Sequence, residues 1–128
     1  MPGKSDWLEN QILNHVLRGT TYTPPSTLYI GLYTSDPTDA GTGTEISGGG
    51  YARQAITFTV STVGSSSNSA DILFPVASAA QGTAGYFGIL DASIAGHLLY
   101  YGPLTPNKSI AIGDQIKIAA GTLTITED

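Results

Sequence analysis

Three acidic side chains lie in one glycine-rich segment and could bind a cation. Asp36, Asp39 and Glu45 all fall within residues 35–50, and carboxylate oxygens are the ligands that calcium prefers. The segment lacks the D-x-D-x-D-G order and the closing glutamate of an EF-hand loop. Asp36 precedes a proline and Asp39 precedes an Ala-Gly pair, as is usual in turns. The spacing therefore favours turn residues over a metal site.

The other residue types that support catalysis or cofactor binding do not form a motif. His15 and His97 are the only histidines, and neither has a second ligand at the spacing of a metal site. The chain has no cysteine, which excludes thiolate catalysis and disulfides, and no serine stands in a G-x-S-x-G motif. The glycines at 48–50 are not followed by the Lys-Ser/Thr of a phosphate loop. The sequence therefore predicts no catalytic residue, no cofactor and no bound metal.

Aromatic residues offer one more kind of chemistry, the stacking of sugars. The chain has seven tyrosines and one tryptophan, and Tyr100 and Tyr101 are adjacent. Neighbouring side chains of a strand point to opposite faces, so we expect one of these two rings in the core and the other on the surface. A carbohydrate-binding module for host attachment remains an alternative.

The segment of residues 6–18 has the pattern of one short helix. Asp6 and Glu9 form a D-x-x-E capping pattern at its start, and Gly19 follows as a C-terminal stop. Its apolar residues recur at a spacing of four, so we expect the resulting stripe to pack on the β domain or on a neighbouring subunit. The stripe is formed by Leu8, Ile12 and Val16.

After the helix, the apolar pattern changes to a period of two, which is typical of strands. Residues 27–34 (TLYIGLYT) are the clearest strand, and residues 35–50 that follow are predicted to form a long exposed loop. About seven strands at short, even spacing predict an antiparallel β-sandwich or barrel with one N-terminal helix, in a single domain of residues 1–128. The remaining strand candidates are QAITFTV, ADILF, AGYFGILD, GHLLYYG, DQIKIA and TLTITE, and GSSSN is predicted to be a polar turn.

The composition limits the partners of this domain. The formal net charge is −5 and the isoelectric point is near 4.6, so neither nucleic acid nor an anionic membrane is an expected partner. No apolar run approaches the length of a membrane span. The first ten residues turn acidic and polar where a signal peptide would be apolar, so we expect synthesis in the cytosol.

Several blocks of the sequence resemble small virion proteins of tailed bacteriophages, which are often labelled tail fibre proteins. The most specific blocks are YTPPSTLYIGLYTSDPTDAG at 22–41, SGGGYARQA at 47–55 and FGILDA at 87–92. The resemblance extends from about residue 8 to residue 126, nearly the whole chain. It implies a structural part of a phage particle, with no reaction and no cofactor.

The resemblance leaves open which part of the particle the protein belongs to. Receptor-binding fibres are long trimers built from repeats or coiled coils, and the sequence shows neither, which slightly favours a capsid decoration (cement) protein over a tail fibre protein. We expect a homo-oligomer, such as a trimer, that contacts the major capsid protein or tail proteins through the helix and the loop. The candidate interface residues are Leu8, Ile12, Val16, Asp36, Asp39, Glu45, Tyr51 and Arg53.

Overall fold

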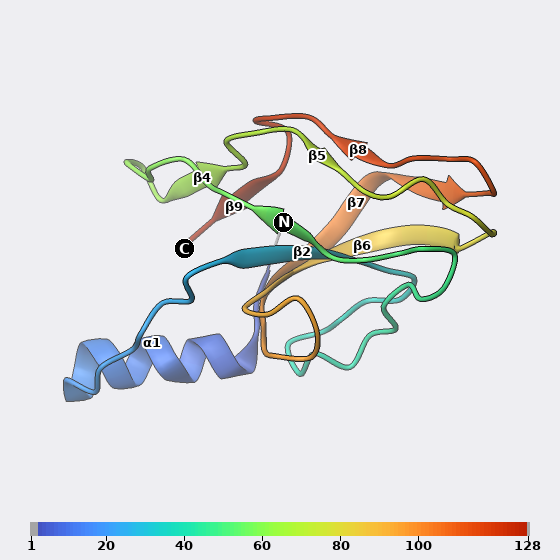
Figure 1. Ribbon diagram of the computed structural model, residues 1–128. Helices are drawn as coiled ribbons and strands as arrows, with labels where there is room; N and C mark the ends of the chain where they lie inside the picture. Colours follow the sequence, from blue (N-terminus) through green and yellow to red (C-terminus); the bar gives the residue numbers. More distant parts are fainter. Residues whose placement is uncertain (1–2, 128) are drawn as a thin grey trace.

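The computed structural model describes residues 3–127 and contains one helix and nine strands (Figure 1). A five-stranded antiparallel sheet has the strand order β1-β7-β6-β2-β3, and two two-stranded antiparallel sheets pair β4 with β9 and β5 with β8. The elements are β1 (Gly3–Lys4), α1 (Asp6–Arg18), β2 (Leu28–Tyr33), β3 (Gln54–Ile56), β4 (Ser65–Ser67), β5 (Ile72–Leu73), β6 (Gly82–Leu90), β7 (Leu98–Ile110), β8 (Lys117–Ile118) and β9 (Thr124–Thr126).

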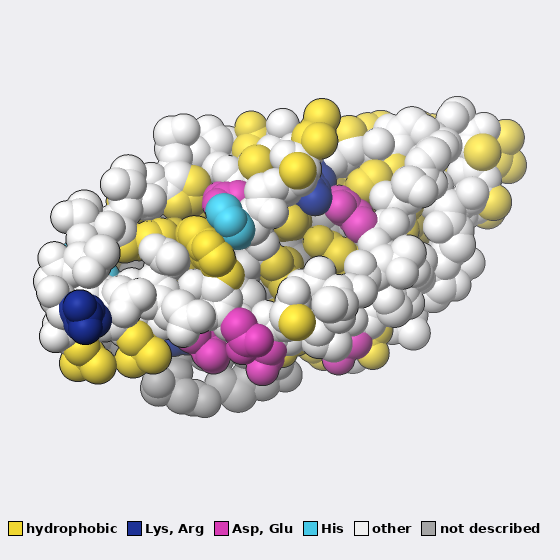
Figure 2. All heavy atoms as spheres, turned by 90° about the horizontal axis from the view of Figure 1, so that it is seen from below, with side chains coloured by type: hydrophobic (Ala, Val, Ile, Leu, Met, Phe, Trp, Pro, Cys, Tyr) yellow, Lys and Arg dark blue, Asp and Glu magenta, His cyan; other side chains and the backbone are white. Residues whose placement is uncertain are grey.

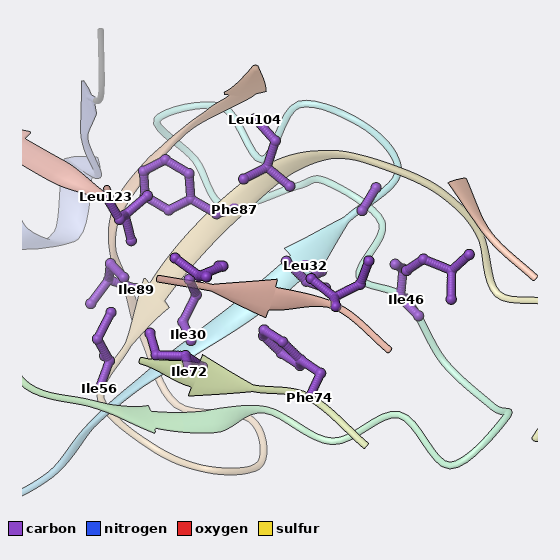
Figure 3. Packing of buried hydrophobic residues seen from close by; sticks show 14 of the residues in the cluster. Ile30, Leu32, Ile46, Ile56, Ile72, Phe74, Phe87, Ile89, Leu104 and Leu123 are labelled. Atoms are coloured by element: carbon purple, nitrogen blue, oxygen red, sulfur yellow. The ribbon is translucent and has the colours of Figure 1, made fainter. Parts of the chain in front are cut away.

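The core lies between the five-stranded sheet and the two small sheets. Alternation along the strands places Ile30 beside Ile89 and Leu32 beside Phe87 on the inner face of the large sheet. Figure 3 shows these side chains facing apolar residues of the opposite layer. The opposite layer contributes Ile72, Phe74, Ile116, Ile118, Leu123 and Ile125.

The predicted β-sandwich is confirmed, but a barrel was the wrong alternative and two strands were missed. The sheets stay open because β1 and β3 form the two edges of the large sheet. The GSSSN segment is not only a turn, since Ser65 and Ser67 pair with Thr126 and Thr124 as β4 and β9. The side chains of β4 are all polar, so the sequence showed no alternating apolar pattern there. The strand is held by its pairing with a distant segment and buries little apolar area.

The helix occupies the predicted range but begins differently. Ser5, not Asp6, is the N-cap, because its side-chain oxygen accepts a hydrogen bond from the backbone N–H of Leu8 at 3.2 Å. Gly19 ends the helix in a left-handed conformation, with φ of 71°. In Figure 1, α1 lies on the side of the large sheet opposite to β4 and β9. Within residues 3–127, no helix has the length and apolar character needed to cross a membrane.

Candidate functional site

The first turn of α1 is fixed to the β domain by several independent contacts. The Ser5 hydroxyl donates a hydrogen bond to the carbonyl of Leu98, and the N–H of Asp6 donates one to the carbonyl of Asp39 at 2.8 Å. Leu8 is buried, with 4% of its surface exposed. Trp7 stacks on the His97 ring, with centroids 4.0 Å apart and an interplanar angle of 8°. The start of the helix therefore has a defined direction relative to the sheet.

The last two turns of α1 expose apolar side chains. Leu13, Val16 and Leu17 are 54%, 70% and 75% exposed, and we refer to these three residues as the helix tip. They lie at i, i+3 and i+4, so they form one continuous apolar surface. The distance from Asp6 to Arg18 along a helix of this length is about 20 Å. The helix thus holds an unpartnered apolar surface at a fixed place beside the domain.

A pair of glycines makes a hollow on the outer face of the large sheet, the face toward α1. Gly31 on β2 lies opposite Gly88 on β6. A Cβ on Gly88 would lie 2.8 Å from both Leu98 Cδ1 and Tyr33 Cε1, and one on Gly31 would lie 2.8 Å from Glu45 Oε2. Only glycine leaves room for these side chains against the sheet.

Glu45, Tyr51 and Arg53 meet over this hollow in one hydrogen-bonded network. Arg53 donates from Nε to Glu45 Oε2 at 2.9 Å and from Nη2 to Glu45 Oε1 at 2.8 Å, which is a bidentate ion pair. The Tyr51 hydroxyl donates to Glu45 Oε2 at 2.6 Å and accepts from the N–H of Leu32 at 2.9 Å. Arg53 Nη1 also donates to the carbonyls of Ala92 and Ala95. The network ties the 34–46 loop, β2 and the β6–β7 loop together.

The pKa values of Tyr51, Tyr33 and Arg53 are all raised within this network. Burial, followed by the hydrogen bond to Glu45, raises the pKa of Tyr51 far above its ordinary value. Burial and the negative charge of Glu45 raise the pKa of Tyr33 to about 12. The hydrogen bond to Glu45 also raises the pKa of Arg53. Both tyrosines therefore stay neutral and Arg53 stays charged at any physiological pH.

A cavity of about 620 Å³ lies between the first turn of α1, the 34–46 loop and the β6–β7 loop, and we refer to it as the outer pocket. Figure 2 views this side of the molecule and shows a hollow near its middle, with acidic, cationic and histidine side chains around it. Trp7, Asp39, Glu45, Arg53 and His97 contribute to its lining. The Glu45–Arg53 pair and the Trp7–His97 stack already engage these groups with one another, so the outer pocket offers few free polar groups to a ligand.

The acidic residues of the 35–50 segment do not converge on a common point. The Asp36 carboxylate accepts a hydrogen bond from the N–H of Thr38 at 2.9 Å, which is an Asx turn. The Asp39 carboxylate accepts a hydrogen bond from the Tyr101 hydroxyl, and this bond, with burial second, raises the pKa of Tyr101 to about 12. Among the described residues, no three His, Asp or Glu side chains form a metal-binding group. The turn interpretation of Asp36 and Asp39 fits these contacts.

His97 is held in the stack by Asp91, and this contact predicts an acid-sensitive helix start. Burial alone would raise the pKa of Asp91, but hydrogen bonds from the N–H and the ring of His97 lower it below 3.8. A lowered folded-state pKa adds stability above the unfolded value, and this contribution is lost as the pH falls through the folded value. We expect Asp91→Asn to lower the melting temperature at pH 7, and the difference from wild type to vanish by about pH 2.

Trp7 is the only tryptophan, so its fluorescence reports directly on this contact during thermal unfolding. Wild type and Asp91→Asn would be compared between pH 7 and pH 2. A difference in melting temperature that stays constant over the whole range would show that ionised Asp91 does not stabilise the fold.

The structure brings together only some of the residues expected to form an interface. Leu8 is buried, Ile12 is half-buried and Val16 is exposed. The start of the predicted stripe therefore packs on the β domain, and its end is exposed to solvent. Sequence reasoning assigned no interface role to Trp7 or His97 and did not identify the Gly31–Gly88 pair. A glycine within each of two strand patterns, YIGLY and YFGIL, was the available signal for the hollow. Four of the candidate interface residues lie at the helix start, and Trp7 and His97, which were not among the candidates, lie there with them. The four candidates are Leu8, Asp39, Glu45 and Arg53.

Comparison with known proteins gives one finding about the whole chain. A sequence model of the family described as Gp80, Podophage GP4 fiber I protein gp80, matches residues 3–126. The match begins at the first residue of β1 and ends at the last residue of β9, so it includes the helix and all nine described strands. No curated protein matches the chain significantly.

Proposed function

Because the chain belongs to the family of the Podophage GP4 fiber I protein gp80, we propose that it is a non-enzymatic structural component of a phage tail fibre, attached to neighbouring virion proteins through the helix tip. Family membership makes the chain a phage structural protein associated with the virion. The attachment surface and the position in the tail are our proposal.

The family description favours the tail over the capsid. The sequence alone gave a slight preference to a capsid decoration protein, because it contains no coiled coil or repeat. The family description supports the alternative, since it names a fibre protein.

The helix tip is the observation that carries the attachment proposal. Leu13, Val16 and Leu17 are exposed together on one helix face, while the start of the same helix is fixed by the Ser5 and Trp7 contacts. An interface core is typically apolar and depleted in charge. A pre-oriented helix also loses little conformational entropy on binding, because its direction is already set.

Two observations support a structural role over catalysis or sugar binding. The most strongly perturbed titratable group of the Glu45 network, Tyr51, is bonded to Glu45 and to a backbone N–H, so it acts as a brace. Tyr100 and Tyr101 lie on opposite faces, and their hydroxyls donate to Glu127 and Asp39. These two rings do not form a common stacking platform for a sugar.

The attachment proposal is tested with virions that lack this protein. Purified wild-type chain is expected to bind such particles at the tail, as seen by electron microscopy of labelled protein. The double variant Val16→Asp, Leu17→Asp is expected to bind at least about tenfold more weakly, because it places two charges in the core of the interface. Its melting temperature should match that of wild type, since both side chains are exposed.

A second double variant controls for added negative charge. Ile94 and Ile112 are 83% and 72% exposed and lie in loops outside the helix tip, so Ile94→Asp, Ile112→Asp adds the same charge away from the helix tip. It should bind the tail as wild type does. Labelling of the capsid shell instead of the tail would restore the decoration protein interpretation, and equal binding by all three proteins would show that the helix tip is not the attachment surface.

A further inference from the structure

A second cavity, of about 540 Å³, lies between the second half of β7 and the segment 117–124, and we refer to it as the side pocket. Pockets for small organic ligands measure about 300–1,000 Å³, so the side pocket has a suitable size. Phe87, Leu104 and Leu123 line it and are buried, so its floor is apolar. In Figure 3, Phe87 lies between the other two side chains. The pocket therefore opens directly onto the core of the sandwich.

A β-bulge in β7 forms one wall of the side pocket. The pairing of β6 with β7 passes from Tyr86–Pro103 to Ala84–Lys108, so Gly85 alone is opposite residues 104–107. A bulge interrupts the ladder, bends the strand and changes the direction of its side chains. The residues of this bulge and those beside it belong to the wall of the pocket. The side pocket thus depends on a local departure from regular strand pairing.

Beyond the bulge, Lys108 points toward the inner side of the large sheet. Lys108 is paired with Ala84, and paired residues of an antiparallel sheet share a face. Ala84 and Ile110, the second residue after Lys108, are 0% and 3% exposed and belong to the core cluster. Lys108 is accordingly half-buried, and it lines the side pocket. A charged amine that is partly removed from water is stabilised by a negatively charged partner.

The described residues do not supply this partner. Within residues 3–127, Lys108 forms no ion pair with a carboxylate. Lys117, the other charged residue of the described lining, is 3.6 Å from Asp71 in an exposed pair, so its charge is already partly offset. No acidic residue is among the described lining, although the chain has ten acidic and five basic residues. The free charge of the pocket is therefore that of Lys108, and it favours an anion.

We propose that the side pocket binds a small hydroxylated organic anion, the class to which uronic acids and sugar phosphates belong. Lys108 pairs with the carboxylate or phosphate, and the carbon skeleton of the ligand lies against the apolar floor. Thr105 and Thr124, which are exposed and also line the pocket, offer hydrogen bonds to hydroxyl groups of the ligand. This inference goes beyond the attachment proposal and does not rest on it, because the lining comes from the β domain and the helix tip lies on α1.

Titrations of nitrogen-15-labelled protein, followed by NMR at constant ionic strength, test this inference. The probes are glucuronate, glucose 6-phosphate, inorganic phosphate and neutral glucose. We expect at least one of the two anionic sugars to shift the amide signals of residues 104–108 and 117–124 in a saturable way. Glucose at the same concentration should leave these signals in place. The anionic sugar that binds more tightly identifies the carboxylate or the phosphate as the preferred group.

Variants of single cationic residues show whether Lys108 provides the charge. Lys108→Gln should bind the anionic sugar at least about tenfold more weakly, because it removes the charge-assisted contact. Lys108→Arg keeps the charge and should retain binding. Arg18→Gln is the matched control, since it removes the same charge from the end of α1, and it should bind as wild type does.

Three results would overturn the inference. The first is the absence of saturable shifts with either anionic sugar, and the second is an equal response to glucose. The third is undiminished binding by Lys108→Gln. If inorganic phosphate binds as tightly as the sugars, the hydroxylated ligand class is wrong, because the threonines and the apolar floor then contribute nothing to affinity.

Discussion

Glu45→Ala is expected to lower the free energy of unfolding by about 2–4 kcal/mol, because it leaves Arg53 and Tyr51 without their shared acceptor. The Arg53 side chain is only 10% exposed, so water cannot fully replace the lost carboxylate. For a chain of this length, the loss corresponds to a decrease in melting temperature of roughly 5–15 °C. Chemical and thermal unfolding followed by circular dichroism measure both quantities.

An exposed ion pair of the same protein provides the matched control. Lys117 and Asp71 are 3.6 Å apart, and their side chains are 57% and 54% exposed. Exposed ion pairs contribute little to stability because water screens their charges, so Asp71→Ala should have a much smaller effect. If the two variants lose the same small amount of stability, the Glu45 network is not a brace of the fold.

The same network links stability to the position of α1. Arg53 donates to two carbonyls of the β6–β7 loop, and that loop carries the His97 ring on which Trp7 stacks. Loss of Glu45 therefore frees Arg53 and loosens the surface that supports the first helical turn. Glu45→Ala should change the fluorescence of Trp7 in the folded state, which Asp71→Ala should not do. We propose that the candidate interface residues Glu45 and Arg53 act indirectly, through the direction of the helix.

The sequence predicts the parts of this fold that depend on local interactions. The bounds of α1 follow from apolar spacing and from Gly19, and β2 follows from the alternation of residues 28–33. β4 could not be predicted, because Ser65–Ser67 are a strand only through pairing with Thr124–Thr126, about sixty residues later. The second half of β7 was missed for a similar reason, since its polar residues are placed by β6.

The sequence indicated only some residues of the candidate site, and it did not indicate their arrangement. The helix stripe was visible as a pattern, but the pattern does not say where the domain ends and solvent begins. Ile12 lies close to that boundary and Val16 lies beyond it. Glu45 and Arg53 are eight residues apart in an irregular segment, so only the tertiary fold brings them to a bidentate distance. Stacking of Trp7 on His97 joins residues ninety positions apart and leaves no local signal.

Gly88→Ala is expected to lower the free energy of unfolding by about 1–3 kcal/mol, because its methyl group has no space. The new carbon would lie 2.8 Å from Leu98 Cδ1 and 2.8 Å from Tyr33 Cε1, and both side chains are buried. Displacement of Leu98 also moves the carbonyl that accepts the Ser5 hydrogen bond, so the helix start should loosen.

Gly85→Ala is the matched control on the same strand, since its methyl group would meet Asn107 at an ordinary 3.5 Å. That control should be neutral or slightly stabilising, because alanine restricts the unfolded chain. Equal unfolding curves for the two variants would show that the outer face has room for a side chain, whereas a loss confined to Gly88→Ala identifies the glycine pair as the feature that lets the helix start and the loops pack against the sheet.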